Sequence, residues 1–207
     1  MLYFESMPKI LTPDVNGNGI VMTNLMARSE IIPSLLNNPM MFYKYDIQEG
    51  DTPEIVADKY YGDSYRYWIV LYANEILDPQ WNWPLNNQQF DNYLTKKYSS
   101  AANNVNVLAY TQSTIKEYRK TVKSIDSLSL VETSETFVID EDTYNSPSIP
   151  SATYQLPNST VSQTISKSIS SIYDYELEQN EAKRSINLIN KIYVSELEQQ
   201  FKSLMSQ

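Results

Sequence analysis

The apolar residues of this chain are concentrated between residues 40 and 98, and their spacing changes from one segment to the next. The first segment alternates: Tyr43, Tyr45 and Ile47 fall on one side of an extended chain. Alternation of this kind predicts a β-strand over residues 42–47.

A short capped helix is predicted directly after this strand. Asp51 or Thr52 can be its N-cap; with Asp51 in that position, Glu54 lies at N3 and gives the spacing of a capping box. Pro53 then lies in the first turn, where its missing N–H costs nothing. Gly62 can end the helix in a left-handed conformation.

Two further helices are predicted in the same region. The first covers residues 64–74 and is apolar on every side in its middle, which is typical of a buried helix. The second covers residues 86–98. An aromatic loop that contains Trp81 and Trp83 lies between them.

The segments on either side are predicted to be less compact. Residues 1–39 have the character of an N-terminal arm with a hairpin, because residues 14–19 are a strong turn signal between two apolar pairs. Residues 99–160 predict a small β extension with long polar connections. Its expected strands cover residues 105–109, 116–122 and 135–139, and its expected turn covers residues 140–142.

Residues 161–207 predict a long C-terminal helix, because apolar residues recur there at intervals of three and four. A helix of this length cannot bury its apolar face on a small domain, so we expect that face to pack against a partner. The residues expected to face this partner are Ile186, Ile189, Tyr193, Leu197 and Phe201. The chain as a whole is predicted to be α+β, with segments 1–39, 40–98, 99–160 and 161–207.

Composition excludes several classes of enzyme. The chain has no cysteine and no histidine, so disulfides, thiolate nucleophiles, Ser-His-Asp triads and the commonest zinc sites are impossible within it. Carboxylates remain, but Asp46, Glu49 and Asp51 lie too close along one strand and turn to face each other across a substrate. No phosphate-binding or dinucleotide motif occurs, so no cofactor and no enzymatic activity are expected.

Charge and hydropathy limit the expected partners. The formal net charge of −9 disfavours nucleic acid and anionic lipid. The longest uninterrupted apolar run, residues 67–73, is far shorter than a membrane span, and the first residues lack the pattern of a signal peptide. We therefore expect a soluble protein made in the cytoplasm, without membrane insertion. Its seventeen tyrosines are typical of protein interfaces.

The order of strand, Gly-Asp-Thr turn, capped helix, glycine stop and second helix resembles the lysin motif (LysM). This small β-α-α-β module usually binds cell-wall glycan in a shallow groove between two loops. The residues that would line the groove, or an interface in its place, are Gly50, Asp51, Thr52, Asn74, Trp81 and Trp83. For Asp51 and Thr52 the favoured role is helix capping alone, and for the aromatic rings it is a core and a protein interface rather than sugar stacking. Where the module usually has its final strand, residues 83–85 and a helix follow instead, which makes glycan binding doubtful.

The chain also resembles the baseplate wedge protein 53 family of contractile-tailed bacteriophages, which contains a LysM-like module. The residues that carry this likeness are 3–4, 8–10, 50–54, 60–63, 67–71, 74, 78–79, 83–85, 90, 93–94, 180–186 and 193–194. The resemblance implies a structural protein of the virion tail baseplate, synthesised in the host cytoplasm and present in several copies around a symmetric ring. It implies that the chain joins neighbouring wedge subunits around the tail hub, with other wedge and hub-proximal proteins as partners. A peptidoglycan-binding LysM module is the alternative.

Overall fold

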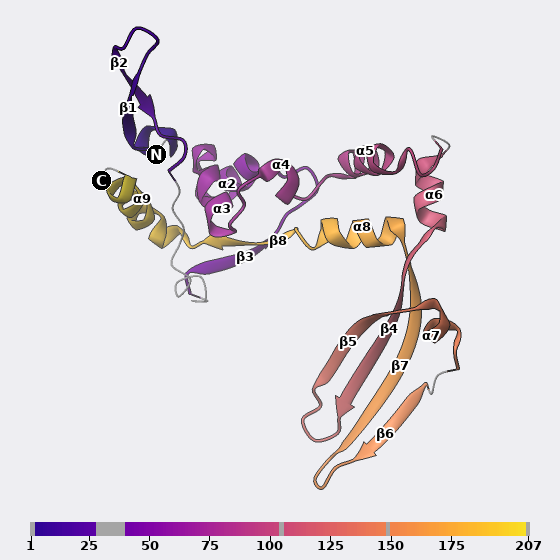
Figure 1. Cartoon of the computed structure of the whole chain (residues 1–207). Coiled ribbons are helices and arrows are strands. Elements are labelled where there is room, and N and C mark those ends of the chain that lie inside the picture. Colours follow the sequence, from indigo (N-terminus) through magenta and orange to yellow (C-terminus); the bar gives the residue numbers. More distant parts are fainter. Residues whose placement is uncertain (1–2, 28–39, 104–105, 148–149, 206–207) are drawn as a thin grey trace. The chain divides into compact units, whose positions relative to one another are not determined.

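A computed structural model describes residues 3–27, 40–103, 106–147 and 150–205. The chain forms two compact units. The first, which we call the split unit, combines Met1–Asn86 with Asn180–Gln207; the second, the inserted unit, is Asn87–Gln179. Both helices and strands are present in each, so the chain is α+β as predicted (Figure 1).

The split unit is built from short elements. In chain order they are η1 (Tyr3–Ser6), β1 (Lys9–Pro13), β2 (Gly19–Thr23), β3 (Phe42–Asp46), α2 (Pro53–Tyr61), η2 (Ser64–Arg66), α3 (Tyr67–Ala73), α4 (Pro79–Asn82), β8 (Ser185–Ile189) and α9 (Lys191–Met205).

Helix α2 has the start and stop that its sequence predicts. Of the two candidate caps, Thr52 is the N-cap: its hydroxyl accepts a hydrogen bond of 3.4 Å from the backbone N–H of Ile55. The alternative capping box from Asp51 is therefore not formed. Gly62 ends the helix with a φ of 71°, a conformation that glycine adopts without steric cost.

The second predicted helix, over residues 64–74, is divided in two. Its first turn is the 3-10 helix η2, capped by the side chain of Asp63, and the α-helix begins only at Tyr67. Helix α3 buries Trp68, Ile69 and Val70.

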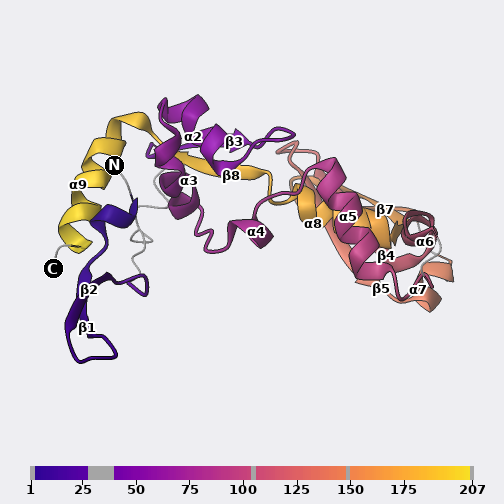
Figure 2. The ribbon, with the colours of Figure 1, turned by 90° about the horizontal axis from the view of Figure 1, so that it is seen from above.

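Strands β3 and β8 form an antiparallel pair although well over a hundred residues separate them in sequence. The register joins Phe42 to Ile189 and Asp46 to Ser185. Helices α2 and α3 lie beside this pair (Figures 1 and 2), and Leu188 on β8 is fully buried in the same core. The order of these elements is strand, helix, helix, strand. The LysM-like character of this unit stays a prediction; the second strand of the pair, β8, lies far beyond residues 83–85 in sequence.

The prediction of a helix throughout residues 161–207 is wrong. Strand β7 (Thr160–Ser171) occupies its start, and β8 carries Ile186 and Ile189 in its middle. A strand and a helix that follow one another can reproduce the three- and four-residue spacing of one helical stripe. No local pattern reveals that β8 pairs with β3, and this pairing is what makes residues 185–189 a strand rather than part of a longer helix.

The N-terminal hairpin is present as predicted. Strands β1 and β2 pair antiparallel from Lys9 opposite Thr23 to Pro13 opposite Gly19. In the part of the chain that the structure describes, neither strand pairs with a third. Several of its apolar side chains are exposed: Ile10, Leu11, Val15, Ile20, Val21 and Met22.

The inserted unit consists of a four-stranded antiparallel sheet and four helices among its described residues. The elements are α5 (Asn87–Tyr98), α6 (Val107–Ser113), β4 (Ile115–Asp126), β5 (Glu132–Ile139), α7 (Glu141–Asn145), β6 (Ser151–Gln155), β7, and most of α8 (Ile172–Glu181). The strand order is β5-β4-β7-β6.

Helix α5 belongs to the inserted unit, so the boundary between the units lies after Asn86 and not at residue 98. The physical reason is packing: Phe90 on α5 is buried and meets Tyr173 on α8 edge to face, with 5.6 Å between the ring centroids. Glu176 on α8 adds polar contacts, since it accepts hydrogen bonds from Tyr93, Lys97 and Tyr98 at 2.6–2.9 Å.

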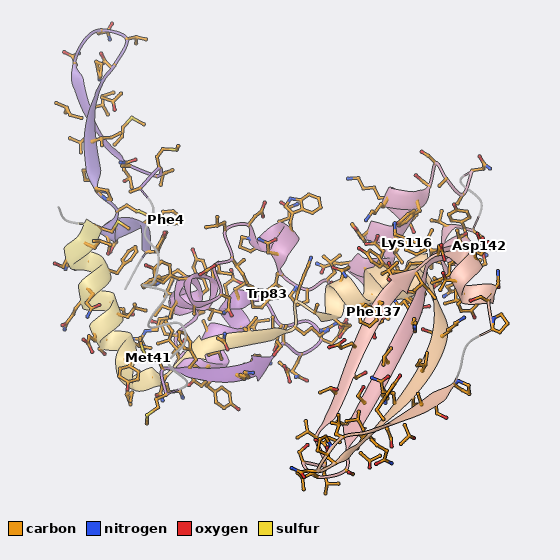
Figure 3. All side chains as sticks on the ribbon, turned by 60° about the horizontal axis from the view of Figure 1, so that its bottom comes forward. Phe4, Met41, Trp83, Lys116, Phe137 and Asp142 are labelled. Atoms are coloured by element: carbon orange, nitrogen blue, oxygen red, sulfur yellow. The ribbon has the colours of Figure 1, made fainter. Side chains whose placement is uncertain are left out.

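The strands predicted over residues 116–122 and 135–139 are confirmed within β4 and β5. The strand predicted over residues 105–109 is wrong, because Asn106 caps the helix α6 there. Residues 140–142 are the capped start of α7 rather than a simple turn. Figure 3 shows the side chains that stand on the sheet and its neighbouring helices.

No helix in the described ranges is both long enough and apolar enough to cross a bilayer.

Candidate functional site

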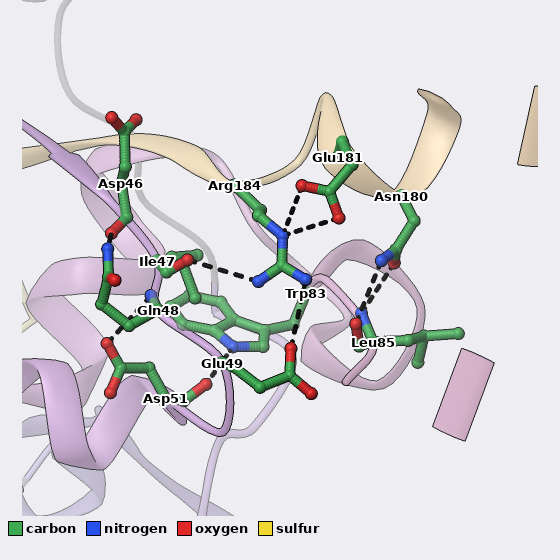
Figure 4. A network of polar contacts seen from close by, with 10 residues as sticks. All are labelled: Asp46, Ile47, Gln48, Glu49, Asp51, Trp83, Leu85, Asn180, Glu181 and Arg184. Atoms are coloured by element: carbon green, nitrogen blue, oxygen red, sulfur yellow. Dashed lines mark hydrogen bonds and ion pairs between the residues drawn. The ribbon is translucent and has the colours of Figure 1, made fainter. Parts of the chain in front are cut away.

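Three segments of the split unit converge at what we call the loop junction: residues 47–51, residues 81–85 and residues 180–184. The first segment follows β3, the second begins within the last turn of α4, and the third begins at the end of α8 and leads into β8. The loop junction contains four of the predicted groove or interface residues, Gly50, Asp51, Trp81 and Trp83, and many of its polar contacts are shown in Figure 4.

Asp51 is the centre of the first segment and is buried. One carboxylate oxygen accepts hydrogen bonds from the hydroxyl of Tyr45 at 2.7 Å and the backbone N–H of Gln48 at 3.2 Å. The other forms an ion pair with Lys59 Nζ at 2.6 Å. Burial alone raises the pKa of Asp51, but these donors outweigh it and hold the pKa below its usual value.

The same hydrogen bond shifts the pKa of Tyr45 in the opposite direction from that of Asp51. Burial of the phenol, and then its hydrogen bond to the Asp51 carboxylate, raise the pKa of Tyr45 to about 12. Asp51 is therefore ionised and fully engaged in holding the strand to the following turn. This arrangement gives it a structural role and leaves it no free proton to exchange with a substrate.

Trp83 closes the junction from the second segment. Its indole is buried, and Nε1–H donates a hydrogen bond of 2.8 Å to the backbone carbonyl of Asp51. Trp81, in contrast, is 63% exposed. Since the ring of Trp83 lies inside the fold, it cannot stack on a sugar, and Trp81 is the only one of the two with that freedom.

The third segment was not identified from sequence as part of a site, yet it makes the most contacts with the other two. Asn180 and Leu85 exchange two hydrogen bonds: the Asn180 amide donates to the Leu85 carbonyl at 3.0 Å, and its oxygen accepts from the Leu85 N–H at 2.7 Å. Lys183 Nζ donates to the carbonyl of Trp81 at 2.7 Å. The only sequence signal for this role is that residues 180–186 carry part of the family likeness.

Arg184 joins the third segment to the first. Its guanidinium forms an ion pair with Glu181 at 2.7 Å and donates to the carbonyl of Ile47 at 3.3 Å, while Glu49 lies at 3.4 Å. The hydrogen bonds to Glu181 and the charge of Glu49 raise the pKa of Arg184. A planar guanidinium can hold several acceptors at once, which lysine cannot do.

Two of the predicted groove or interface residues, Asn74 and Thr52, lie outside the loop junction, whereas Gly50 belongs to its first segment. The side chain of Asn74 bridges the end of α3 to β8: it donates to the carbonyl of Asn187 at 2.8 Å and accepts from the N–H of the same residue at 2.8 Å. Thr52 caps α2, and Gly50 turns the chain with a φ of 82°. The structure thus brings Gly50, Asp51 and Trp83 together, includes Trp81 through its backbone carbonyl while its ring stays exposed, and places Asn74 apart from them.

The residues expected to face a partner helix pack within the split unit. Ile186 and Ile189 are buried on β8, and Phe201 is buried on α9 between Tyr3 and Trp68, at centroid distances of 5.3 and 4.9 Å. Tyr193 and Leu197 are partly buried against the same core. The prediction of a free apolar face fails here because η1 and α3 cover it.

Within the described ranges, no group of three or more acidic residues converges in a way that could hold a metal ion. The contacts of the loop junction are between groups of the chain itself, and they hold its three segments together.

Comparison with known proteins gives one result that spans both units. A family model described as Base plate wedge protein 53 matches residues 10–204, which is nearly the whole chain. The match confirms the family likeness drawn from the sequence. The chain matches none of the curated proteins with which it was compared.

Proposed function

The chain belongs to the base plate wedge protein 53 family, and from this premise we propose that it joins neighbouring wedge subunits around the tail hub during baseplate assembly. Membership of the family implies a structural role in the phage tail baseplate and contact with other baseplate proteins. The finer statement, that one copy links two neighbours, is the proposal. The single observation that carries it is that the family match extends from residue 10 to residue 204 and so includes both units.

The exposed apolar surface of the split unit supports a role in assembly. The β1–β2 hairpin exposes Leu11, Val21 and Met22 to between 51% and 74%. A lone two-stranded hairpin is marginally stable in water, and exposed apolar groups of this kind mark surfaces that another protein covers. The hairpin is therefore one of the segments that we propose to contact a neighbouring subunit.

The loop junction supports the proposal in another way. Residues 180–184 return the chain from the inserted unit and are held to residues 47–51 and 81–85 by hydrogen bonds and an ion pair. A linker between subunits must transmit force without opening, and a braced return segment suits that purpose. We propose a non-enzymatic protein that needs no cofactor.

A reconstruction of the intact phage tail tests the proposal. We expect the chain in several copies around the baseplate ring, with each copy touching two neighbouring wedges. A baseplate that lacks this chain, or in which each copy touches only one neighbour, would contradict it.

Binding to purified peptidoglycan tests the alternative of a glycan-binding module. With Trp83 buried, a sugar could stack only on Trp81, so saturable binding that W81A abolishes would favour the alternative. We expect no such binding.

A further inference from the structure

Strand β5 is an open edge of the sheet in the inserted unit. It lies outermost in the order β5-β4-β7-β6 and pairs with β4 from Ile139 opposite Tyr118 to Glu132 opposite Ile125 (Figure 1). Within the described ranges, no backbone hydrogen bond reaches its other side. Its outward N–H and C=O groups are therefore available to another strand.

This edge lacks the common features that prevent strand addition. It is eight residues long, contains neither proline nor lysine, and pairs with β4 without a bulge. The opposite edge, β6, is five residues long and lies between Pro150 and Pro157. Proline cannot donate to a strand ladder, so β6 is the protected edge and β5 the open one.

The charge along β5 indicates which kind of chain can pair with it. The strand carries two carboxylates, Glu132 and Glu135, and no lysine or arginine. Three more carboxylates follow it at the start of α7: Asp140, Glu141 and Asp142. Glu135 makes no recorded polar contact, and the ion pair of Glu132 with Lys123 is exposed at 3.4 Å. A second copy of β5 would bring its own Glu132 and Glu135 to the same edge, and like charges across strands are destabilising. The edge therefore favours a basic segment over another copy of itself.

The register of the sheet gives the pattern of that segment. Phe137 lies opposite Lys120 and Ile139 opposite Tyr118, so these two apolar residues share one face of the sheet with Glu135. Phe137, labelled in Figure 3, is 48% exposed. A strand added beside β5 would place apolar side chains next to Phe137 and basic side chains next to Glu135.

We propose that β5 accepts an extended, basic segment of another baseplate protein as a fifth strand of this sheet. Main-chain hydrogen bonds along the edge supply the affinity, and the alternation of apolar and basic side chains supplies the specificity. This inference deepens the proposed function and rests on it, because it names a surface through which the chain joins a neighbour.

Hydrogen exchange in the full-length chain tests the added strand directly. In the free chain, the outward-facing amides of residues 132–139 exchange rapidly; in purified tails we expect them to exchange at least about tenfold more slowly. The amides of β6 should not change. A β5 that exchanges equally fast in the free chain and in tails that contain it would overturn the inference while leaving the proposed function intact. Tails from which the chain is missing would overturn both.

A competition experiment tests the charge. Cells that assemble phage supply the unmodified chain and a variant in equal amounts, and mass spectrometry measures the ratio of the two in purified tails. We expect E135K to be depleted about tenfold, because the attraction between Glu135 and the basic side chains of the added strand becomes a repulsion between like charges.

The matched control is D91K, which makes the same change of charge on α5 of the same unit. Among the described residues, the carboxylate of Asp91 has no hydrogen-bond or ion-pair partner. We expect it to be incorporated normally. Equal incorporation of E135K and D91K would overturn the inference. Thermal unfolding of the free variants shows whether each is folded before assembly. If E135K is depleted because it does not fold, the hydrogen-exchange experiment on the unmodified chain decides whether β5 gains a strand.

Discussion

The indole Nε1–H of Trp83 donates a hydrogen bond of 2.8 Å to the main-chain carbonyl of Asp51. These residues were both predicted to line a groove between two loops, and the bond instead closes the two loops on each other. The ring of Trp83 is part of the core, the role favoured for this aromatic cluster over stacking on a sugar.

Replacing Trp83 with phenylalanine keeps an aromatic ring but removes the donor. We expect W83F to lower the free energy of unfolding of the split unit by about 1–3 kcal/mol, because a buried carbonyl is left without a partner. W81F, at an exposed position, should change it by less than about 0.5 kcal/mol. Urea unfolding followed by circular dichroism measures both. Equal stability of the two variants would show that the bond to Asp51 contributes nothing.

The return segment of the chain gives the second prediction. Asn180 is buried and both donates to and accepts from the backbone of Leu85. We expect N180A to lower the free energy of unfolding by about 2–3 kcal/mol, because two backbone groups lose their partner.

Hydrogen exchange at the Leu85 amide provides a local readout of this change, and it should become faster in N180A. The exposed Asn82, for which no side-chain contact is recorded, offers the control N82A. If the Leu85 amide exchanges equally fast in N180A and in the unmodified chain, the pair does not hold residues 81–85 in place.

Local signals in the sequence were sufficient for some elements and not for others. Thr52 and Gly62 mark the ends of α2 within the sequence itself, and turn residues mark the β1–β2 hairpin. Strand β8 has no such signal: Ile186 and Ile189 fit the spacing of a helix that continues to Tyr193. Its strand conformation depends on pairing with β3, which lies far away in sequence.

In the candidate site, too, some features follow from local sequence signals and others depend on contacts with distant segments. The turn that holds Asp51 was predictable because glycine, cap and proline occur together in the sequence. The roles of Asn180 and Arg184 were not, because their partners are backbone carbonyls and N–H groups of distant segments. A backbone group looks the same at every position in a sequence, so the pairing becomes visible only in the fold.

Titration of Tyr45 gives the third prediction. Its pKa is raised from 10.0 to about 12 by burial and by the hydrogen bond to Asp51. A phenol whose pKa is higher in the folded state contributes stability that is fully present below about pH 10 and is lost as the pH rises toward 12. In D51N the carboxylate is gone, so we expect the pKa of Tyr45 to fall.

The absorbance of phenolate at 295 nm, compared between each chain and its Y45F counterpart, isolates this one tyrosine. The difference curve of the unmodified chain should show a midpoint near 12. An identical midpoint in D51N would mean that burial alone sets the pKa.

Glu176 in the inserted unit gives the fourth prediction. Burial raises the pKa of its carboxyl, but hydrogen bonds from Lys97, Tyr98 and Tyr93 outweigh burial and hold it below 4.5. A carboxyl whose folded pKa is depressed contributes stability above its unfolded pKa and loses it as the pH falls through the folded value. We therefore expect E176Q to destabilise the inserted unit at pH 7 and to have a smaller effect below about pH 4.

Denaturant unfolding at pH 7 and at pH 3.5 checks this difference. E135Q serves as the control, because Glu135 makes no recorded polar contact, and its effect should be small at both pH values. A destabilisation of E176Q that is the same at both pH values would place the contribution of Glu176 in packing rather than in charge.

Phe201 gives the last prediction, and it separates packing within the chain from contact with a partner. Its ring is 3% exposed and lies 4.9 Å from that of Trp68, whereas Leu204 on the same helix is 54% exposed. We expect F201A to lower the free energy of unfolding of the split unit by about 3–5 kcal/mol, because it removes a buried ring and leaves a cavity. L204A should lower it by less than about 1 kcal/mol in the free chain. Urea unfolding of both variants measures these two free energies.

Incorporation of both variants into tails, measured at a low and a high growth temperature, shows whether Phe201 also acts through a partner. If Phe201 acts through the core, its loss reduces incorporation mainly at the higher temperature, where the destabilised unit unfolds. A free F201A chain as stable as L204A that still fails to enter tails at either temperature would restore the partner-facing role first expected for α9.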